Sequence, residues 1–306
     1  METVAVLGGG KIGEALLGGL VAAGRSPGGL LVVEAVAARA AELGERYGIG
    51  AVDAAEAARR ADVLVVAVKP GDVPAALDQV HDVLAGRGPD GDRPTVVSLA
   101  AGIPTASLEA RLPADTAVVR VMPNTPMLVG RAMCVLSPGA AAGEAELALT
   151  EGLLAAVGRT VRVPESQQDL ATALSGSGPA YVFLLAEAMI DAGVALGMPR
   201  ATATELVTAT VEGAGGLLTT PGSDGREGAA PHPGLLREAV TSPGAPPRPR
   251  WARSRPRVCA PPSPARSPLL ATVPWPSGVR TAERAGRCRG SVRRDGIVLR
   301  RVGVDA

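Results

Sequence analysis

Short apolar runs alternate with segments of helical periodicity along the first half of the chain. Apolar runs of about four to eight residues, bounded by Gly, Pro or polar residues, are typical of buried strands. We expect strands at Val4–Leu7, Leu30–Glu34, Ala61–Val68, Thr95–Leu99 and Ala117–Val121. Helical patterns such as those at 12–21 and 37–47 lie between them. This alternation predicts an α/β fold with a Rossmann-like, doubly wound sheet.

The pattern changes past Gly158, where helical periodicity replaces the strands. Pro179 suits the first turn of an apolar helix that we expect over Ala180–Leu196, and a second helix is expected over Ala201–Leu218. Both helices have more apolar surface than a pair of helices can bury between themselves. We therefore expect a partner subunit to cover them.

Three glycines follow the first predicted strand at the spacing GxGxxG, directly before a helix. Gly8 permits the tight turn, Gly10 lets a pyrophosphate approach the backbone, and Gly13 allows close packing of helix on strand. The N-terminus of the helix then faces the phosphates with unpaired N–H groups. A merely structural glycine turn is the alternative, but the position after a strand favours dinucleotide binding.

Glu34 ends the second predicted strand, 21 residues after Gly13. A carboxylate at this point accepts hydrogen bonds from the adenosine ribose and repels a 2′-phosphate, which favours NAD over NADP. Arg39 is close enough in sequence to compete, and a solvated strand end is the plainer interpretation of Glu34. The choice between NADPH and NADH stays open at this point.

The composition is that of a soluble protein of about two domains, with 306 residues of which 46% are hydrophobic. No apolar run approaches the roughly 20 residues that span a bilayer, and the N-terminus lacks a signal sequence, so we expect a cytoplasmic protein. The chain has three scattered cysteines, Cys134, Cys259 and Cys288, and two histidines, His81 and His232. Their number and spacing indicate neither a disulfide framework nor a metal site.

Charge divides the chain in two. Through Gly244 there are 17 Lys and Arg against 27 Asp and Glu, whereas from Ala245 onward there are 14 Arg and only 3 acids. A basic tail suggests an arm that binds nucleic acid as one hypothesis. Because this tail carries a proline every few residues, we expect no nucleic-acid partner. Because the apolar runs are too short to span a bilayer, we expect no membrane partner.

Several short segments, in matching order and spacing over about 240 residues, resemble the pyrroline-5-carboxylate reductase family. They read VLGGGKIGEA from Val6, AVKP from Ala67, RVMPNTP from Arg120, VPE from Val163, LSGSGPAY from Leu174, DAGVALG from Asp191 and LREAVTSPG from Leu236. The pair SGSGPAY and TSPG is far more specific than the glycine loop.

The resemblance implies reduction of 1-pyrroline-5-carboxylate to L-proline by NADPH or NADH, the last step of proline biosynthesis. It implies a dinucleotide-binding domain over residues 1–162 and an all-α dimerisation and substrate domain over residues 163–244. Dimers or dimer-based oligomers are expected. Because the cofactor performs the hydride transfer, such a site needs positioning and polar groups but no histidine or metal.

The resemblance also implies roles for single residues. Cofactor contacts are expected from the glycine loop and from the loops after the strands: Leu7, Gly8, Gly9, Gly10, Lys11, Ile12, Gly13, Glu34, Ala67, Val68, Lys69, Pro70, Ala100, Ala101 and Asn124. Catalytic and substrate contacts are expected from Glu165, Ser177, Thr241, Ser242 and Gly244. Plainer roles are that Asn124 only sets a turn and that Ser175 and Ser177 only cap a helix.

The resemblance ends at Gly244, where the family continues with Gly-Thr-Thr. Pro246 and Pro247 stand in place of the threonines, and proline offers neither a hydroxyl nor an N–H. Back-translated codons from Ala245, read one nucleotide earlier, accommodate Gly-Thr-Thr and the residues that follow, and the fixed codon of Trp251 fits. We predict a shifted reading frame and a disordered, irregular tail over 245–306. A catalytically impaired, dinucleotide-binding remnant is the alternative function.

Overall fold

The computed structural model describes residues 2–88, 93–223 and 232–241. By its internal contacts the chain divides into residues 1–231 and residues 232–306, and each part is described by itself. The predicted tail from residue 245 lies outside the described residues, so the predicted disorder and frameshift remain predictions.

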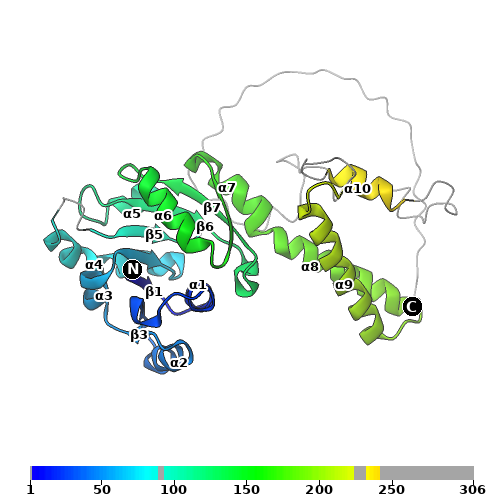
Figure 1. The fold of residues 1–306 in the computed structure, drawn as a ribbon, viewed down its shortest axis with the longest axis horizontal. Coiled ribbons are helices and arrows are strands. Elements are labelled where there is room, and N and C mark those ends of the chain that lie inside the picture. Colours follow the sequence, from blue (N-terminus) through cyan, green and yellow to red (C-terminus); the bar gives the residue numbers. More distant parts are fainter. Residues whose placement is uncertain (1, 89–92, 224–231, 242–306) are drawn as a thin grey trace, which may run out of the picture. The chain divides into compact units, whose positions relative to one another are not determined.

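The described residues form one eight-stranded sheet in the order β3-β2-β1-β4-β5-β6-β7-β8 (Figure 1). All neighbouring strands pair in parallel except β6 and β7, which are antiparallel. The strands are β1 (Val4–Leu7), β2 (Leu30–Val33), β3 (Gly50–Ala51), β4 (Val63–Val66), β5 (Thr95–Ser98), β6 (Val118–Met122), β7 (Ala132–Pro138) and β8 (Gly158–Arg162). The strand order reverses direction between β1 and β4, and in such sheets the ligand crevice lies there, beyond the carboxyl ends of the strands.

The helices cover both faces of the sheet. Strand residues alternate between two cores: Val4 and Val6 pack with α1, α2 and α6, and Ala5 and Leu7 pack with α3, α4 and α5. The helices of this part are α1 (Lys11–Ala22), α2 (Ala37–Tyr47), α3 (Ala54–Arg60), α4 (Val73–Gly86), α5 (Thr105–Glu109) and α6 (Glu144–Leu154). The predicted doubly wound fold is confirmed.

The strand pattern continues further than expected. The sequence predicts a change to helices past Gly158, but β7 and β8 extend the sheet to Arg162. No residue of β8 is fully buried, because β8 lies at the edge of the sheet. An edge strand needs no apolar run, so the hydrophobic pattern misses it.

The helical segment after the sheet contains α7 (Gln168–Ala171), the π-helical turn η5 (Thr172–Gly176), α8 (Gly178–Ala195) and α9 (Arg200–Thr219). The α8 and α9 helices contact each other, with Gly193 close to the methyl group of Ala203. No residue of α8 is buried, and the aromatic ring of Phe183 is among its most exposed apolar groups. An all-α segment with a large uncovered apolar surface therefore follows the sheet, as predicted.

The remaining short helices are connectors: η1 (Pro27–Gly29), η2 (Pro70–Asp72), η3 (Thr125–Val129) and η4 (Glu165–Gln167). In the second part, the described residues form α10 (Pro233–Ala239), whose first turn is capped by the His232 side chain accepting from the Gly234 N–H.

Candidate active site

Among the three motif glycines of the loop between β1 and α1, only Gly10 has open space beside its Cα. Gly8 has a φ of +108°, and a Cβ there would lie 2.9 Å from the Ala67 carbonyl carbon. A Cβ on Gly13 would collide with the carbonyl oxygen of Gly8, whereas a Cβ on Gly10 would meet nothing within 4 Å. The loop is thus packed against the end of β4 and open over Gly10, beside the first turn of α1. This concave backbone fits a pyrophosphate.

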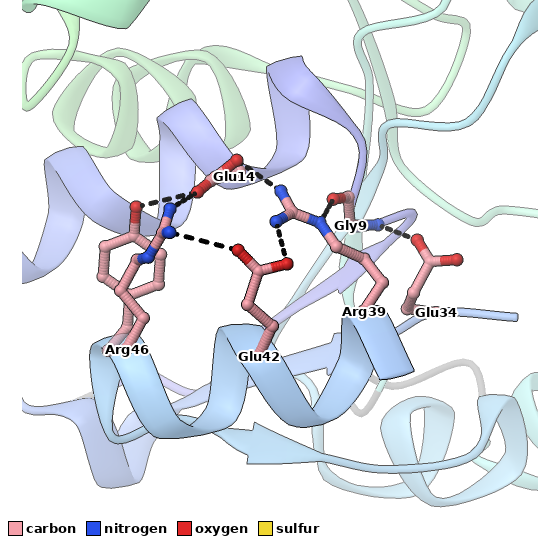
Figure 2. Close-up of polar contacts among 7 residues, drawn as sticks. Gly9, Glu14, Glu34, Arg39, Glu42 and Arg46 are labelled. Carbon is pink, nitrogen blue, oxygen red and sulfur yellow. Dashed lines mark hydrogen bonds and ion pairs between the residues drawn. The ribbon is translucent and has the colours of Figure 1, made fainter. Parts of the chain in front are cut away.

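Glu34 lies directly against this loop. Its Oε2 accepts a hydrogen bond of 2.9 Å from the Gly9 N–H (Figure 2). Its Oε1 accepts one of 2.9 Å from the Val36 N–H. The carboxylate is therefore fixed beside the glycine loop. The interpretation of Glu34 as a merely solvated strand end is wrong, because one of its oxygens is bonded to the loop itself.

The loops after β4 and β5 lie next to the glycine loop, since β1, β4 and β5 are consecutive in the sheet. They contain Ala67, Val68, Lys69 and Pro70 after β4, and Ala100 and Ala101 after β5. Ala100 is buried, and its N–H donates to the Ser98 hydroxyl at 3.4 Å. These positions line the same carboxyl edge of the sheet that the glycine loop occupies.

The two lysines of the whole chain both belong to this edge. Lys11 begins α1 and Lys69 precedes η2. Both side chains are exposed, and neither makes an ion pair within the described residues. The site thus carries two cations without internal partners, which suits a ligand with phosphate groups.

Asn124 joins the sheet to the helical segment. Its Nδ2 donates to the Ser175 carbonyl at 3.0 Å, and its Oδ1 accepts from the Met133 N–H at 2.9 Å. A Cβ on Gly176 would lie 2.8 Å from the Met122 side chain. The side chain of Asn124 does not cap the η3 helix that follows it. The alternative that Asn124 only sets a turn is therefore wrong, because its amide spans two distant segments.

Ser177 follows the π-helical turn and does not cap α8 with its side chain. Its N–H donates to the Thr172 carbonyl at 2.8 Å, so the chain passes into α8 without the extended residue that a cap requires. Pro179 has no N–H to offer, and the Ala180 N–H donates instead to the Ser177 carbonyl at 3.0 Å. The capping role is wrong for Ser177, whose hydroxyl has no partner within the described part of the chain.

Ser175 is bonded within its own turn. Its hydroxyl donates to the Ala171 carbonyl at 2.9 Å. This bond runs back toward the preceding turn, so Ser175 also does not cap α8.

Glu165 is held by three donors. It accepts from the Thr105 N–H at 2.7 Å, the Thr105 hydroxyl at 2.8 Å and the Arg120 guanidinium at 3.1 Å. Burial alone would raise the pKa of Glu165, but these donors together lower it below its ordinary value. The carboxylate is therefore ionised and ties η4 to α5 and β6. A catalytic role for Glu165 stays a prediction.

Arg120 is a partner of Glu165 that sequence reasoning missed. Its side chain is buried at 8% exposure in the middle of the sheet. A cation inside an otherwise apolar strand, VVRVM, is the signal that such a partner exists. The pattern does not identify Glu165, which lies 45 residues further along the chain.

The predicted residues at the C-terminal end cannot be placed with the others. Thr241 ends the described segment after α10, and its hydroxyl donates to the Arg237 carbonyl at 2.8 Å. Ser242 and Gly244 lie outside the described residues.

Cys134 is buried on β7, and burial raises its pKa to about 11, so it is an unreactive thiol.

Within the described ranges, no cluster of three or more His, Cys, Asp or Glu suits a metal ion. One described helical run, Glu165–Ala195, is long and apolar enough to cross a membrane by length and composition alone.

A doubly wound sheet with an open glycine loop and a fixed acidic residue at the end of β2 defines a dinucleotide-dependent oxidoreductase. Comparison with known proteins gives the same class. Residues 3–102 match the family described as "NADP oxidoreductase coenzyme F420-dependent", and residues 165–246 match "Pyrroline-5-carboxylate reductase dimerisation". The second match contains the apolar run Glu165–Ala195 and supports self-association of the chain.

Two bacterial relatives, both pyrroline-5-carboxylate reductases, are similar to this chain over most of its length. A pyrroline-5-carboxylate reductase of Corynebacterium melassecola is 43% identical over 244 residues, 79% of this chain and 86% of that protein. One of Mycobacterium tuberculosis is 42% identical over 253 residues, 80% of this chain and 86% of that protein. The chain belongs to the pyrroline-5-carboxylate reductase family.

Solved structures agree with this. A pyrroline-5-carboxylate reductase of Coxiella burnetii has a TM-score of 0.71 at 32% identity and covers 80% of this chain and 87% of its own. The Plasmodium falciparum enzyme, solved with NADP bound, has a TM-score of 0.67 at 26% identity and covers 80% of this chain and 86% of its own. None of these relatives supports the alternative of an impaired, dinucleotide-binding remnant.

Proposed function

We propose that this chain reduces 1-pyrroline-5-carboxylate to L-proline with a nicotinamide dinucleotide. The observation that carries the proposal is the 43% identity to a reductase of that name, over a span that covers 86% of it. That span is long enough to include both the glycine loop and the helical segment.

The residues present fit the cofactor. The open backbone at Gly10 and the first turn of α1 receive the pyrophosphate, and the free cations of Lys11 and Lys69 offset its charge. When bound, the nicotinamide would supply a hydride to the carbon of the substrate C=N bond, whose nitrogen must carry a proton. The protein positions the two reactants and excludes water, which requires packed loops and no metal.

The substrate side involves residues from the helical segment. The Ser177 hydroxyl, without a partner in the described part of the chain, is available to donate a hydrogen bond to a polar atom of the substrate. Asn124 supports this turn by its bond to the Ser175 carbonyl. Thr241, Ser242 and Gly244 are assigned to the substrate carboxylate. Glu165 acts as a positioning residue, since its donors are Thr105 and Arg120.

The proposed organisation is a cofactor domain over residues 1–162 and a helical domain over 163–244 that pairs with a second copy. An apolar groove of about 620 Å³ on α8 and α9 suits this pairing, and its lining includes Phe183, Leu184 and Ile190. A biosynthetic reductase that uses a soluble dinucleotide and a small polar substrate is assigned to the cytoplasm.

The test is a steady-state assay of the purified 306-residue chain with pyrroline-5-carboxylate and either NADH or NADPH. A copy with the reading frame restored after Gly244 is assayed beside it, and circular dichroism checks that both are folded. We expect the 306-residue chain to oxidise a dinucleotide only when the substrate is present.

Two results overturn the proposal. If both folded proteins are inactive, the substrate is wrong. If only the frame-restored copy is active, this chain is not a reductase, and the residues lost after Gly244 are essential for the substrate step.

A further inference from the structure

The peptide group of Gly9 is held on both of its polar atoms by charged side chains that follow β2. Glu34 Oε2 accepts from the Gly9 N–H at 2.9 Å, and Arg39 Nε donates to the Gly9 carbonyl at 3.1 Å (Figure 2). The Val36 N–H fixes the second oxygen of Glu34 at 2.9 Å. The carboxylate therefore has a set position at the edge of the glycine loop, where a Rossmann fold receives the adenosine ribose.

Arg39 is the cation best placed to accept a 2′-phosphate at this position, but it is already paired. Its guanidinium bonds to Glu14 on α1 and, at 2.8 Å, to Glu42 on α2. Figure 2 shows the guanidinium between these two carboxylates. Only 26% of the Arg39 side chain is exposed. The charge of Arg39 is therefore already paired with carboxylates of the protein.

Glu14 is a strong partner for Arg39. It also accepts from Arg46 at 2.7 Å and from the Tyr47 hydroxyl at 3.2 Å. Burial alone would raise the pKa of Glu14, but the donors Arg39, Tyr47 and Arg46 together lower it. The carboxylate stays ionised at neutral pH, so the pair with Arg39 persists under the conditions of an assay.

We propose that Glu34, with Arg39 held away by Glu14, makes this site select NADH over NADPH. The inference rests on the proposed function only through the dinucleotide, and it does not depend on the substrate. A free ribose hydroxyl donates a hydrogen bond to the fixed Glu34 carboxylate, whereas a 2′-phosphate meets its negative charge. To receive that phosphate, Arg39 must leave both Glu14 and Glu42.

This selection runs against the description of the family that matches residues 3–102 and against the NADP found in the Plasmodium falciparum structure. It comes from the acids of this chain. Specificity of this kind depends on an unfavourable contact with the wrong ligand as much as on a favourable one with the right ligand.

The test is equilibrium binding of NADH and of NADPH to the full chain, without substrate, by isothermal titration calorimetry. We expect NADH to bind about tenfold more tightly, as one unscreened like-charge contact near a protein surface is enough for this ratio. The variant Glu34→Gln keeps the size and an amide oxygen for the Gly9 N–H. It should bring the ratio close to one, mainly by tightening NADPH binding.

Two more variants separate the parts of the proposal. Glu14→Gln weakens the hold on Arg39 and should improve NADPH binding with little effect on NADH. Glu45→Gln removes the same charge from an exposed position of α2, where Glu45 makes no ion pair within the described residues, and should leave the ratio unchanged. Circular dichroism of each variant checks that it is folded.

Equal or tighter binding of NADPH by the unmodified chain overturns the proposal, and so does an equal shift in Glu34→Gln and Glu45→Gln. The outcome is independent of turnover. A chain that selects NADH but reduces no pyrroline-5-carboxylate loses the proposed function and keeps this inference, and an active chain that prefers NADPH does the reverse.

Discussion

Strand β4 and helix α8 are both strongly apolar, yet they have opposite surroundings. Every residue of β4 is buried between the two faces of the sheet, while no residue of α8 is buried. The sheet completes its own core from α1 to α6. The helical segment presents Phe183, Leu184 and Leu185 to the outside at 53–65% exposure. A large exposed apolar surface is typical of an interaction site, and the family model that matches residues 165–246 is one of dimerisation.

The largest expected effect is on the core that the chain makes by itself. Leu64 of β4 is fully buried. Leu64→Ala leaves a cavity and should lower the free energy of unfolding by about 2–5 kcal/mol, equally at every protein concentration. Urea unfolding followed by circular dichroism measures this. A loss below about 1 kcal/mol would mean that the sheet core is loosely packed.

The next effect concerns the glycine loop of the same part. Gly8→Ala places a Cβ at a φ of +108° and 2.9 Å from the Ala67 backbone. We expect the free energy of unfolding to fall by about 1–3 kcal/mol. The dinucleotide should bind more weakly by a similar free energy, which calorimetry measures. Gly152→Ala on α6, where a Cβ meets nothing within 4 Å, is the control and should bind normally. Unaltered affinity in Gly8→Ala would contradict this position of the pyrophosphate.

A smaller effect is expected in the helical segment, and it should depend on protein concentration. Phe183→Ala removes an exposed ring from α8 and should weaken self-association by more than about 1 kcal/mol. Light scattering over a dilution series measures the association. Unfolding at the lowest concentrations should stay unchanged, and a concentration-independent loss would refute the distinction between the two regions.

The smallest effect is expected at Glu165, which joins the start of the helical segment to the sheet. Glu165→Gln weakens the tie to Thr105 and Arg120, and because Glu165 is about one-third exposed we expect a loss of about 1 kcal/mol. The pKa of Glu165 is lowered in the folded state, so its contribution is complete above the ordinary value near 4.5 and is lost as the pH falls through the lowered pKa.

Thermal unfolding across this acid range checks the sign. The stability of the unmodified protein should fall toward that of Glu165→Gln as the carboxylate is protonated. A gap between them that widens in acid would show that the charge of Glu165 is not what stabilises the tie.

Local patterns were sufficient for the sheet. The apolar run Val4–Leu7 and the helix over 37–47 occur with the predicted ends, because each is set by contacts within one supersecondary unit. The glycine spacing likewise predicted a turn at Gly8. This residue has a positive φ, which glycine adopts more easily than other residues.

Long-range contacts were not accessible in the same way. The π-helical turn that precedes Ser177, and that excludes the alternative capping role, contacts Met122 and Asn124, about 50 residues earlier. The pairing of Arg39 with Glu14 joins α2 to α1 and decides whether Arg39 is free. Sequence spacing places such residues near a site, but only the fold determines which partner each one takes.

The most direct test of the central claim is the molar mass of the unmodified chain by sedimentation equilibrium over a wide concentration range. The chain has a mass of 30.7 kDa. A second copy that covers α8 and α9 predicts a mass of twice that value or more at high concentration, falling on dilution. A folded protein that stays at 30.7 kDa throughout, with its apolar helices uncovered, would contradict the account.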